Sequence, residues 1–255
     1  MARDPMGATL LTINPVHRMG PVCYASLPCD TEPPKGHGTN GEEAKHRLVS
    51  ILWDPLVKMD SPLRTFCLSS NRAAFPIQIV HDPLGRPHLR LGEHRGPAIS
   101  FSTAGKEVWA ALCGDGSDIG IDVAESAEFQ DGYPMHRVFH APELHQALEL
   151  AGGDLAGAAA LLWSIKEAVA KALGCAFHLV DPRDIHVYPS AVEPGGPAFS
   201  VRLSGNARMR FPMADRAPIT VHSLAQGGAW LSIAALIWPR HRVARPNACE
   251  AGQRD

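Results

Sequence analysis

Two segments of the chain carry charged side chains at spacings that could do chemistry. Asp122 lies in the segment 120–124, and Glu167 and Lys171 lie four residues apart in a later, alanine-rich stretch. On a helix, residues four apart share a face, so Trp163, Glu167 and Lys171 would line up on one side. Carboxylates and amines in such a row could hold a cation and an anionic substrate. They could equally form an ordinary solvated ion pair, and these residues alone leave both interpretations open.

The charged row needs a helix and a strand to position it. Asp154 is a suitable N-cap, the alanine-rich stretch predicts a helix over residues 155–173, and Gly174 is placed to cap its C-terminus. Asp122 lies near the end of a short apolar segment, residues 117–124, which predicts a strand.

The remaining pattern predicts an α+β chain of two similar-sized halves. The first forty or so residues are rich in Pro and Gly and predict a loosely ordered start with a short strand near residues 20–27. Further elements are predicted by periodicity and turn residues: a helix over 42–52, a hairpin over 98–114, and strands over 75–82, 184–189, 198–204, 219–225 and 229–238. We expect an N-terminal lobe over residues 1–117, a C-terminal lobe with the charged site over 118–240, and a flexible tail over 241–255.

Composition excludes several classes of function. The chain has 24 Lys plus Arg against 26 Asp plus Glu, which disfavours a nucleic-acid binder that works by bulk electrostatics. No apolar run is long enough to span a bilayer, and the start lacks the pattern of a signal peptide. The six cysteines are scattered, which favours reduced thiols over a zinc ribbon or a disulfide framework. We therefore expect a cytoplasmic protein.

The two charged segments together resemble the paired signature of the 4′-phosphopantetheinyl transferase superfamily. Its pattern is GIDxE on a strand followed by WxxKEAxxKxxG on a helix, and this chain has GIDVA at 120–124 and WSIKEAVAKALG at 163–174. Upstream, GRP at 85–87 resembles the family's GKP turn, and SFSTA at 100–104 stands where the family has an NxSHS-type strand end. The resemblance covers roughly residues 40–238. It implies a fold of two similar halves packed pseudo-symmetrically around a coenzyme A cleft.

The resemblance also implies a reaction. The family transfers 4′-phosphopantetheine from coenzyme A to a serine of an apo acyl or peptidyl carrier protein, with Mg²⁺ as the cofactor. Asp122 and Glu167 would hold the metal, while Lys166 and Lys171 would hold the phosphates and stabilise the departing 3′,5′-ADP. Glu167 or a metal-bound water would take the serine proton, so Asp122, Glu167 and Lys171 are the catalytic candidates. The chain length fits the monomeric, two-lobed type, and fatty-acid, polyketide and nonribosomal-peptide synthesis all remain open.

Coenzyme A contacts are predicted upstream by the same resemblance. Arg86 suits a phosphate geometrically, although a solvated surface arginine is equally consistent with the sequence. Arg47 matches the family's arginine near the 3′-phosphate, and Ser102 and Thr103 fall in the segment that contacts coenzyme A phosphate.

Two positions depart from the family pattern. Ala124 stands where the usual third acidic ligand falls, and Glu125 next to it would point to the opposite face of the strand. Thr103 replaces the histidine of the SHS pattern. The first departure favours a site with two carboxylates. Together they leave a second function open, in which a repurposed family member binds coenzyme A or a carrier protein without efficient transfer.

A histidine cluster is the main rival for a functional site. His136 and His140 are four residues apart, a spacing that metal ligands on a helix can have, and His145 follows, but no HExxH arrangement is present. We expect structural or exposed roles for the three. Phe139 with Glu143 instead resembles the family segment that shapes the carrier-protein side, and ordinary packing by Phe139 is the alternative.

Overall fold

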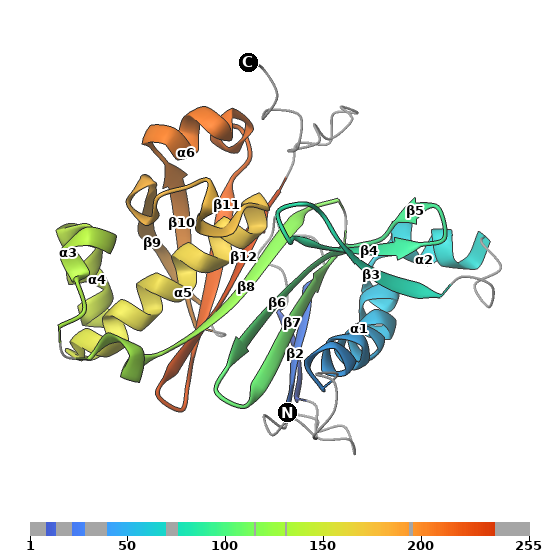
Figure 1. Cartoon of the computed structure of the whole chain (residues 1–255), viewed down its shortest axis with the longest axis horizontal. Coiled ribbons are helices and arrows are strands. Elements are labelled where there is room, and N and C mark those ends of the chain that lie inside the picture. The colour runs from blue at the N-terminus through green and yellow to red at the C-terminus, as the bar shows by residue number, and fades with distance from the viewer. Residues whose placement is uncertain are drawn as a thin grey trace.

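The computed structural model describes residues 9–13, 22–28, 40–69, 76–114, 116–130, 132–193 and 196–237. They form an α+β fold in which two large antiparallel sheets lie side by side, each with a long helix on its outer face (Figure 1). Strands of the first large sheet come from residues up to Cys113, and those of the second from Asp118 onward.

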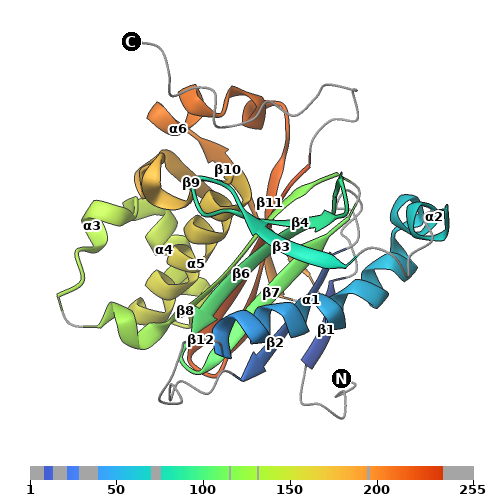
Figure 2. The ribbon, with the colours of Figure 1, turned by 45° about the vertical axis from the view of Figure 1, so that its right-hand side comes forward.

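The first sheet carries one long helix and a small three-stranded sheet. Its strand order is β1-β2-β7-β6, with β1 (Thr9–Ile13), β2 (Val22–Pro28), β6 (Ala98–Ala104) and β7 (Glu107–Cys113). Helix α1 (Asn40–Met59) lies across this sheet and α2 (Ser61–Ser69) follows it, as Figure 2 shows. The small sheet consists of β3 (Ile77–His81), β4 (Pro87–Leu91) and β5 (His94–Arg95).

The second sheet has the order β8-β12-β11-β10-β9. Its strands are β8 (Asp118–Glu125), β9 (Ile185–Glu193), β10 (Gly196–Leu203), β11 (Ile219–Gln226) and β12 (Ala229–Leu236). Helix α5 (Leu155–Leu173) packs on it, beside α3 (Met135–Val138), α4 (Ala141–Leu150) and α6 (Gly205–Arg210). Short 3₁₀ turns complete this half: η2 (Ser126–Phe129), η3 (Ala176–His178), η4 (Pro182–Asp184) and η5 (Pro212–Asp215).

Both sheets are connected in the same order. In each, the strand that precedes the long helix pairs with the last strand of its half, and the next-to-last strand follows on the other side. This gives β2-β7-β6 in one half and β8-β12-β11 in the other. In both cases the long helix packs on the strand that precedes it and on the last strand of its half, α1 on β2 and β7 and α5 on β8 and β12. The two halves therefore share one topology, although the amino-acid sequence shows no internal repeat.

The sheet faces that point away from the helices pack against each other. Tyr24 and Trp109 of the first sheet and Ile121 and Ile233 of the second belong to one buried apolar cluster. The alternation of a strand places Asp122 on the other face of β8, towards α5. The core between the halves thus fixes the strand that carries the acidic residue.

Helix α5 forms as its sequence predicts. The Asp154 side chain accepts a hydrogen bond from the Ala156 N–H, and Gly174 ends the helix in a left-handed conformation with φ of 83°. The helix lies so close to β8 that a Cβ at Gly120 would fall against the Ala168 carbonyl oxygen. Glycine at this position lets the strand and the helix approach each other.

The structure has elements that were not predicted, namely α2, β4, β5, α4 and α6, and it also differs near the N-terminus. The strand β1 was not predicted, and it pairs with β2 along Thr9–Ile13. The first helix runs from Asn40 to Met59, longer than the periodicity predicted, and continues through Pro55. The predicted tail lies outside the described residues. No single described helix has the length and apolar character of a membrane span, although α4 and α5 do as a pair bent by 113°.

Candidate active site

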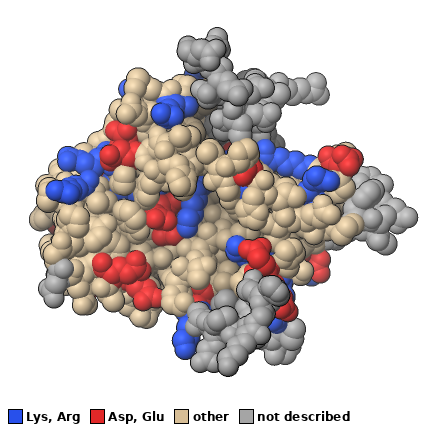
Figure 3. All heavy atoms as spheres, viewed as in Figure 1, with Lys and Arg blue, Asp and Glu red and all other residues tan. Residues whose placement is uncertain are grey.

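Two carboxylates from different elements converge on one ammonium group. The Lys171 Nζ lies 2.6 Å from Asp122 Oδ1 and 3.6 Å from Glu167 Oε2, and it also donates to the Ile121 carbonyl at 3.2 Å. Asp122 comes from β8, and Glu167 and Lys171 come from consecutive turns of α5. In Figure 3 acidic and basic groups adjoin each other near the middle of the face, over the C-terminal half of α5. The predicted catalytic residues are thus close enough to act on one group.

The charged row is the accessible side of an otherwise buried helix. From Gly157 to Leu173 every residue of α5 is buried except Trp163, Glu167 and Lys171. The ring centroids of Trp163 and Phe177 lie 5.2 Å apart. The row of Trp163, Glu167 and Lys171 therefore has an apolar end and a charged end. Solvent or a substrate can therefore reach α5 along the row that the sequence spacing predicted.

The Asp122 carboxylate is buried, which disfavours its charged form. The pKa of its carboxyl is raised to about 6, chiefly by burial; the Lys171 ammonium opposes this rise, the Glu167 carboxylate adds to it, and the Ser102 hydroxyl opposes it. Two carboxylates and one ammonium leave a net negative charge at this site. A bound cation would offset that charge.

Ser102 is also at the site, where its side chain contacts Asp122 and the backbone of β8. Its side chain is buried, its hydroxyl donates to Asp122 Oδ1 at 2.9 Å, and its oxygen accepts from the Val123 N–H at 3.3 Å. The Ser102 hydroxyl thus contacts the Asp122 carboxylate, and its predicted contact with coenzyme A stays a prediction.

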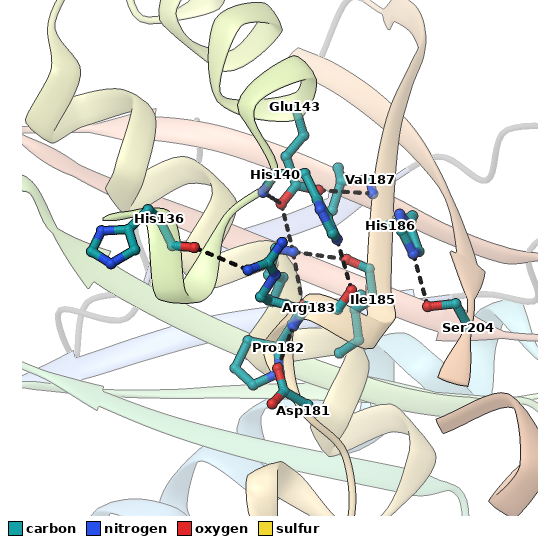
Figure 4. Close-up of polar contacts among 11 residues, drawn as sticks. His136, His140, Glu143, Asp181, Pro182, Arg183, Ile185, His186, Val187 and Ser204 are labelled. Carbon is teal, nitrogen blue, oxygen red and sulfur yellow. Dashed lines mark hydrogen bonds and ion pairs between the residues drawn. The ribbon is translucent and has the colours of Figure 1, made fainter. Parts of the chain in front are cut away.

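Lys166 lies inside the fold, away from the accessible row. It is 0% exposed, and its ammonium donates to Glu143 at 2.7 Å and to the carbonyl oxygens of Pro182 and Ile185, both at 2.8 Å. Figure 4 shows this cluster, in which Glu143 also accepts from the backbone N–H groups of His140 and Val187. All three ammonium protons have protein partners. The prediction that Lys166 binds coenzyme A phosphate is corrected, because the residue anchors α5 to α4 and β9.

Arg86 joins the two halves of the molecule. It follows a turn in which Asp82 Oδ1 accepts from the Leu84 and Arg86 N–H groups, both at 2.9 Å. Its guanidinium donates to Asp118 Oδ1 at 2.7 Å and to the Ala172 carbonyl at 3.3 Å, at the C-terminal end of α5. A positive charge is favourable at this end of a helix. Arg86 is thus a contact between the lobes as well as a coenzyme A candidate.

The other upstream candidates are not in contact with the carboxylates. Thr103 is exposed on β6 next to Ser102, and Arg47 is exposed on α1. Ala124 is 1% exposed and belongs to the apolar core around α5, so nothing at this position can supply a third ligand. Glu125 is the N-cap of η2, and its side chain accepts a hydrogen bond from the backbone N–H of Glu128.

The three histidines make contacts with protein groups. His140 stacks on His186 with ring centroids 4.6 Å apart, and its Nε2 lies 2.8 Å from the Arg183 carbonyl oxygen. The His136 carbonyl accepts from the Arg183 guanidinium, and His145 is exposed beside Glu149. Phe139 is buried in the core, as its packing alternative predicted.

Tyr133, which lies near Glu128 and Glu167, was not predicted as a site residue from the sequence. Burial raises the pKa of its hydroxyl, and the negative charges of Glu128 and Glu167 raise it further. Its ring packs against Phe129 with centroids 4.8 Å apart. Tyr133 lies in a Gly- and Pro-flanked segment without periodicity, so no sequence signal pointed to its place beside Glu167.

Asp122 and Glu167 could supply two ligands to a divalent cation that takes the rest from substrate and water. Mg²⁺ is commonly held by one or two carboxylates, substrate phosphates and water. Within the described ranges, no group of three His, Cys, Asp or Glu side chains could hold a metal ion. A two-carboxylate site completed by substrate oxygens is therefore the arrangement that these residues allow.

Comparison with known families agrees with this geometry. Residues 118–209 match the family model described as ACPS, the 4′-phosphopantetheinyl transferase superfamily. The matched segment contains β8, α5 and all three residues of the Asp122–Lys171–Glu167 cluster. No curated protein matches the chain.

Solved structures similar to this chain cover about half of it. The ACPS–CoA complex of Chronobacterium ammoniagenes is 20% identical with a TM-score of 0.40, over 49% of this chain and 100% of its own. AcpS of Neisseria meningitidis, a holo-[acyl-carrier-protein] synthase, is 16% identical with a TM-score of 0.39, over 47% and 96%. AcpS of Mycobacterium tuberculosis, an acyl carrier protein synthase, is 26% identical with a TM-score of 0.34, over 48% and 97%.

The raised pKa of Asp122 predicts a pH dependence for any reaction at this site. A metal or phosphate site needs the ionised carboxylate, so kcat/KM is expected to rise with pH through about 6 and then level off. Because the folded-state pKa lies above its ordinary value, the contribution of this group to stability is lost as pH rises through about 6. A profile from about pH 5 to about pH 8 checks the first expectation. A rate that is flat across that range would contradict it.

Proposed function

We propose that this protein transfers 4′-phosphopantetheine from coenzyme A to a serine of an apo acyl or peptidyl carrier protein, with Mg²⁺ as cofactor. The observation that carries the proposal is the convergence of Asp122 and Glu167 on the Lys171 ammonium, inside the segment that matches the superfamily. An acidic pair beside a lysine suits a substrate whose reacting part is a pyrophosphate.

The chemistry needs negative charge to be stabilised more strongly as the reaction proceeds. The serine oxygen bonds to the β-phosphorus of coenzyme A while the pyrophosphate P–O bond breaks, and the electron pair leaves with 3′,5′-ADP. Mg²⁺ held by Asp122 and Glu167 would supply charge neutralisation at the pyrophosphate. The Lys171 ammonium stabilises the leaving phosphate, which gains negative charge in the transition state. Glu167 is 28% exposed, so its carboxylate can accept the serine proton.

The substrate contacts follow from the accessible face. Lys171 is the phosphate contact nearest the carboxylates, and Arg86 at the end of α5 extends the positive charge along the boundary between the halves. Arg47 and Thr103, both exposed on the first half, are retained as outer coenzyme A contacts. The side chains lie on two relatively rigid elements and their neighbours, which suits a reaction that depends on positioning.

A transfer assay tests the proposal. The purified protein is incubated with apo carrier protein, coenzyme A and Mg²⁺, and the carrier is measured by intact-mass spectrometry. We expect the carrier to gain the mass of one phosphopantetheine group, and to gain nothing when the cation is removed by chelation. A panel of fatty-acid, polyketide and nonribosomal-peptide carriers identifies the pathway that is served.

A second function is favoured by the burial of Ala124. Because this position is 1% exposed and apolar, the site has one acidic ligand fewer than the family pattern. A protein with this site could bind coenzyme A or a carrier protein without efficient transfer. Binding of coenzyme A by calorimetry, with no mass gain on any carrier in the panel, would support this alternative and refute the transferase.

A further inference from the structure

The two halves of the molecule meet along β6 and β8 through serine side chains. Ser100 Oγ accepts from the Ile121 N–H at 3.1 Å, and Ser102 Oγ accepts from the Val123 N–H at 3.3 Å. Strand β6 is the edge of the first sheet and β8 is the edge of the second. Two hydroxyls spaced two residues apart therefore bind alternate N–H groups of the strand that carries Asp122.

Ser102 does more than Ser100, because its proton points to the catalytic carboxylate. Its hydroxyl donates to Asp122 Oδ1 at 2.9 Å, while Lys171 donates to the same oxygen at 2.6 Å. Two donors thus fix Oδ1. Among the described residues no hydrogen bond or ion pair reaches Oδ2, which leaves this oxygen for another ligand.

The geometry of Ser102 argues against a phosphate contact of its own. A hydroxyl has one proton to donate, and here that proton is used by Asp122. The side chain is 8% exposed and lies between the two strands. A phosphate oxygen would have to displace the carboxylate to receive this proton.

We propose that Ser102 is a positioning residue that holds Asp122 by Oδ1 and turns Oδ2 towards the cation. The inference rests on the proposed function, since it assigns Ser102 to the carboxylate that would bind the cation. It also makes the site depend on the first half of the chain, outside the matched segment 118–209. Contacts that orient a ligating carboxylate commonly contribute about 10- to 100-fold in metal affinity or activity.

Ser100 offers a matched control for this role. Ser102→Ala and Ser100→Ala each remove one buried hydroxyl and one bond to a β8 N–H, but only the first removes the bond to Asp122. Affinity for Mn²⁺ is measured on the full chain with coenzyme A present, by electron paramagnetic resonance of the free ion. Thermal unfolding is recorded for both variants, because the loss of the β8 contact should affect them alike.

We expect Ser102→Ala to weaken Mn²⁺ binding by about 10- to 100-fold, Ser100→Ala to leave it unchanged, and Ser102→Thr to restore it. The fall in transfer should appear in kcat and in the KM for the cation, not in the KM for coenzyme A. Equal Mn²⁺ affinities for the two alanine variants would overturn the positioning role while leaving the proposed function intact. If the unmodified protein neither binds Mn²⁺ nor transfers the group, the proposed function fails and the role of Ser102 fails with it.

Discussion

Glu167→Gln is expected to lower Mg²⁺-dependent transfer by about 100-fold or more while leaving the fold intact. The substitution keeps the shape of a side chain that is 28% exposed and removes one of the two charges that face Lys171. Its effect on stability should therefore be small, within about 0.5 kcal/mol. The rate of mass gain on the carrier and the free energy of unfolding are the two measurements.

The chain provides a control for the loss of an ordinary surface carboxylate. Glu149 lies four residues after His145 on α4, 3.7 Å from its ring, and its side chain is 74% exposed. Glu149→Gln makes the same chemical change away from the site and should leave transfer unaltered. Equal transfer rates for Glu167→Gln and Glu149→Gln would show that Glu167 and Lys171 form only a solvated ion pair, and would refute the role assigned to Glu167.

Glu143→Ala is expected to destabilise the protein by about 3–5 kcal/mol, the usual cost of breaking a buried ion pair. The change leaves Lys166, which is 0% exposed, without its counter-charge, and it removes an acceptor for the N–H groups of His140 and Val187. Burial already lowers the pKa of the Lys166 ammonium, and Glu143 opposes that shift. Denaturant unfolding measures the loss.

Two further variants separate the buried pair from a general effect of charge removal. Asp215→Ala breaks the exposed Arg208–Asp215 pair and should cost no more than about 1 kcal/mol. Replacing both partners, Glu143→Leu with Lys166→Met, should recover much of the loss, since no uncompensated charge then remains. A Glu143→Ala variant as stable as Asp215→Ala would show that the interior pair does not anchor α5.

Helix α5 could be predicted from the sequence because all its determinants are local. The Asp154 cap, the run of alanines and Gly174 fix its two ends, and the spacing of Trp163, Glu167 and Lys171 fixes their common face. The hairpin of β6 and β7 and the strand β8 were predicted from alternation and turn residues for the same reason.

The contacts between elements could not be predicted in this way. Lys166 and Glu167 are neighbours in the chain, but a helix turns them to different sides, and only the positions of α4 and β9 show that Lys166 is internal. Ser102 lies twenty residues before Asp122, and its contact depends on how the two sheets meet. The buried positions of Ser100 and Ser102 alternate with Ile99 and Phe101 in β6, and these two serines were the available sign that the strand has a polar neighbour.

We propose that Asp122 and Glu167 hold one cation between them, beside Lys171. Crystals grown with Mn²⁺ and coenzyme A test it most directly, because the anomalous scattering of manganese locates the ion independently of the protein phases. We predict one anomalous peak that contacts an oxygen of each carboxylate and the pyrophosphate, at about 2.0–2.3 Å. A peak bound to only one of the two carboxylates, or to neither, would contradict the account.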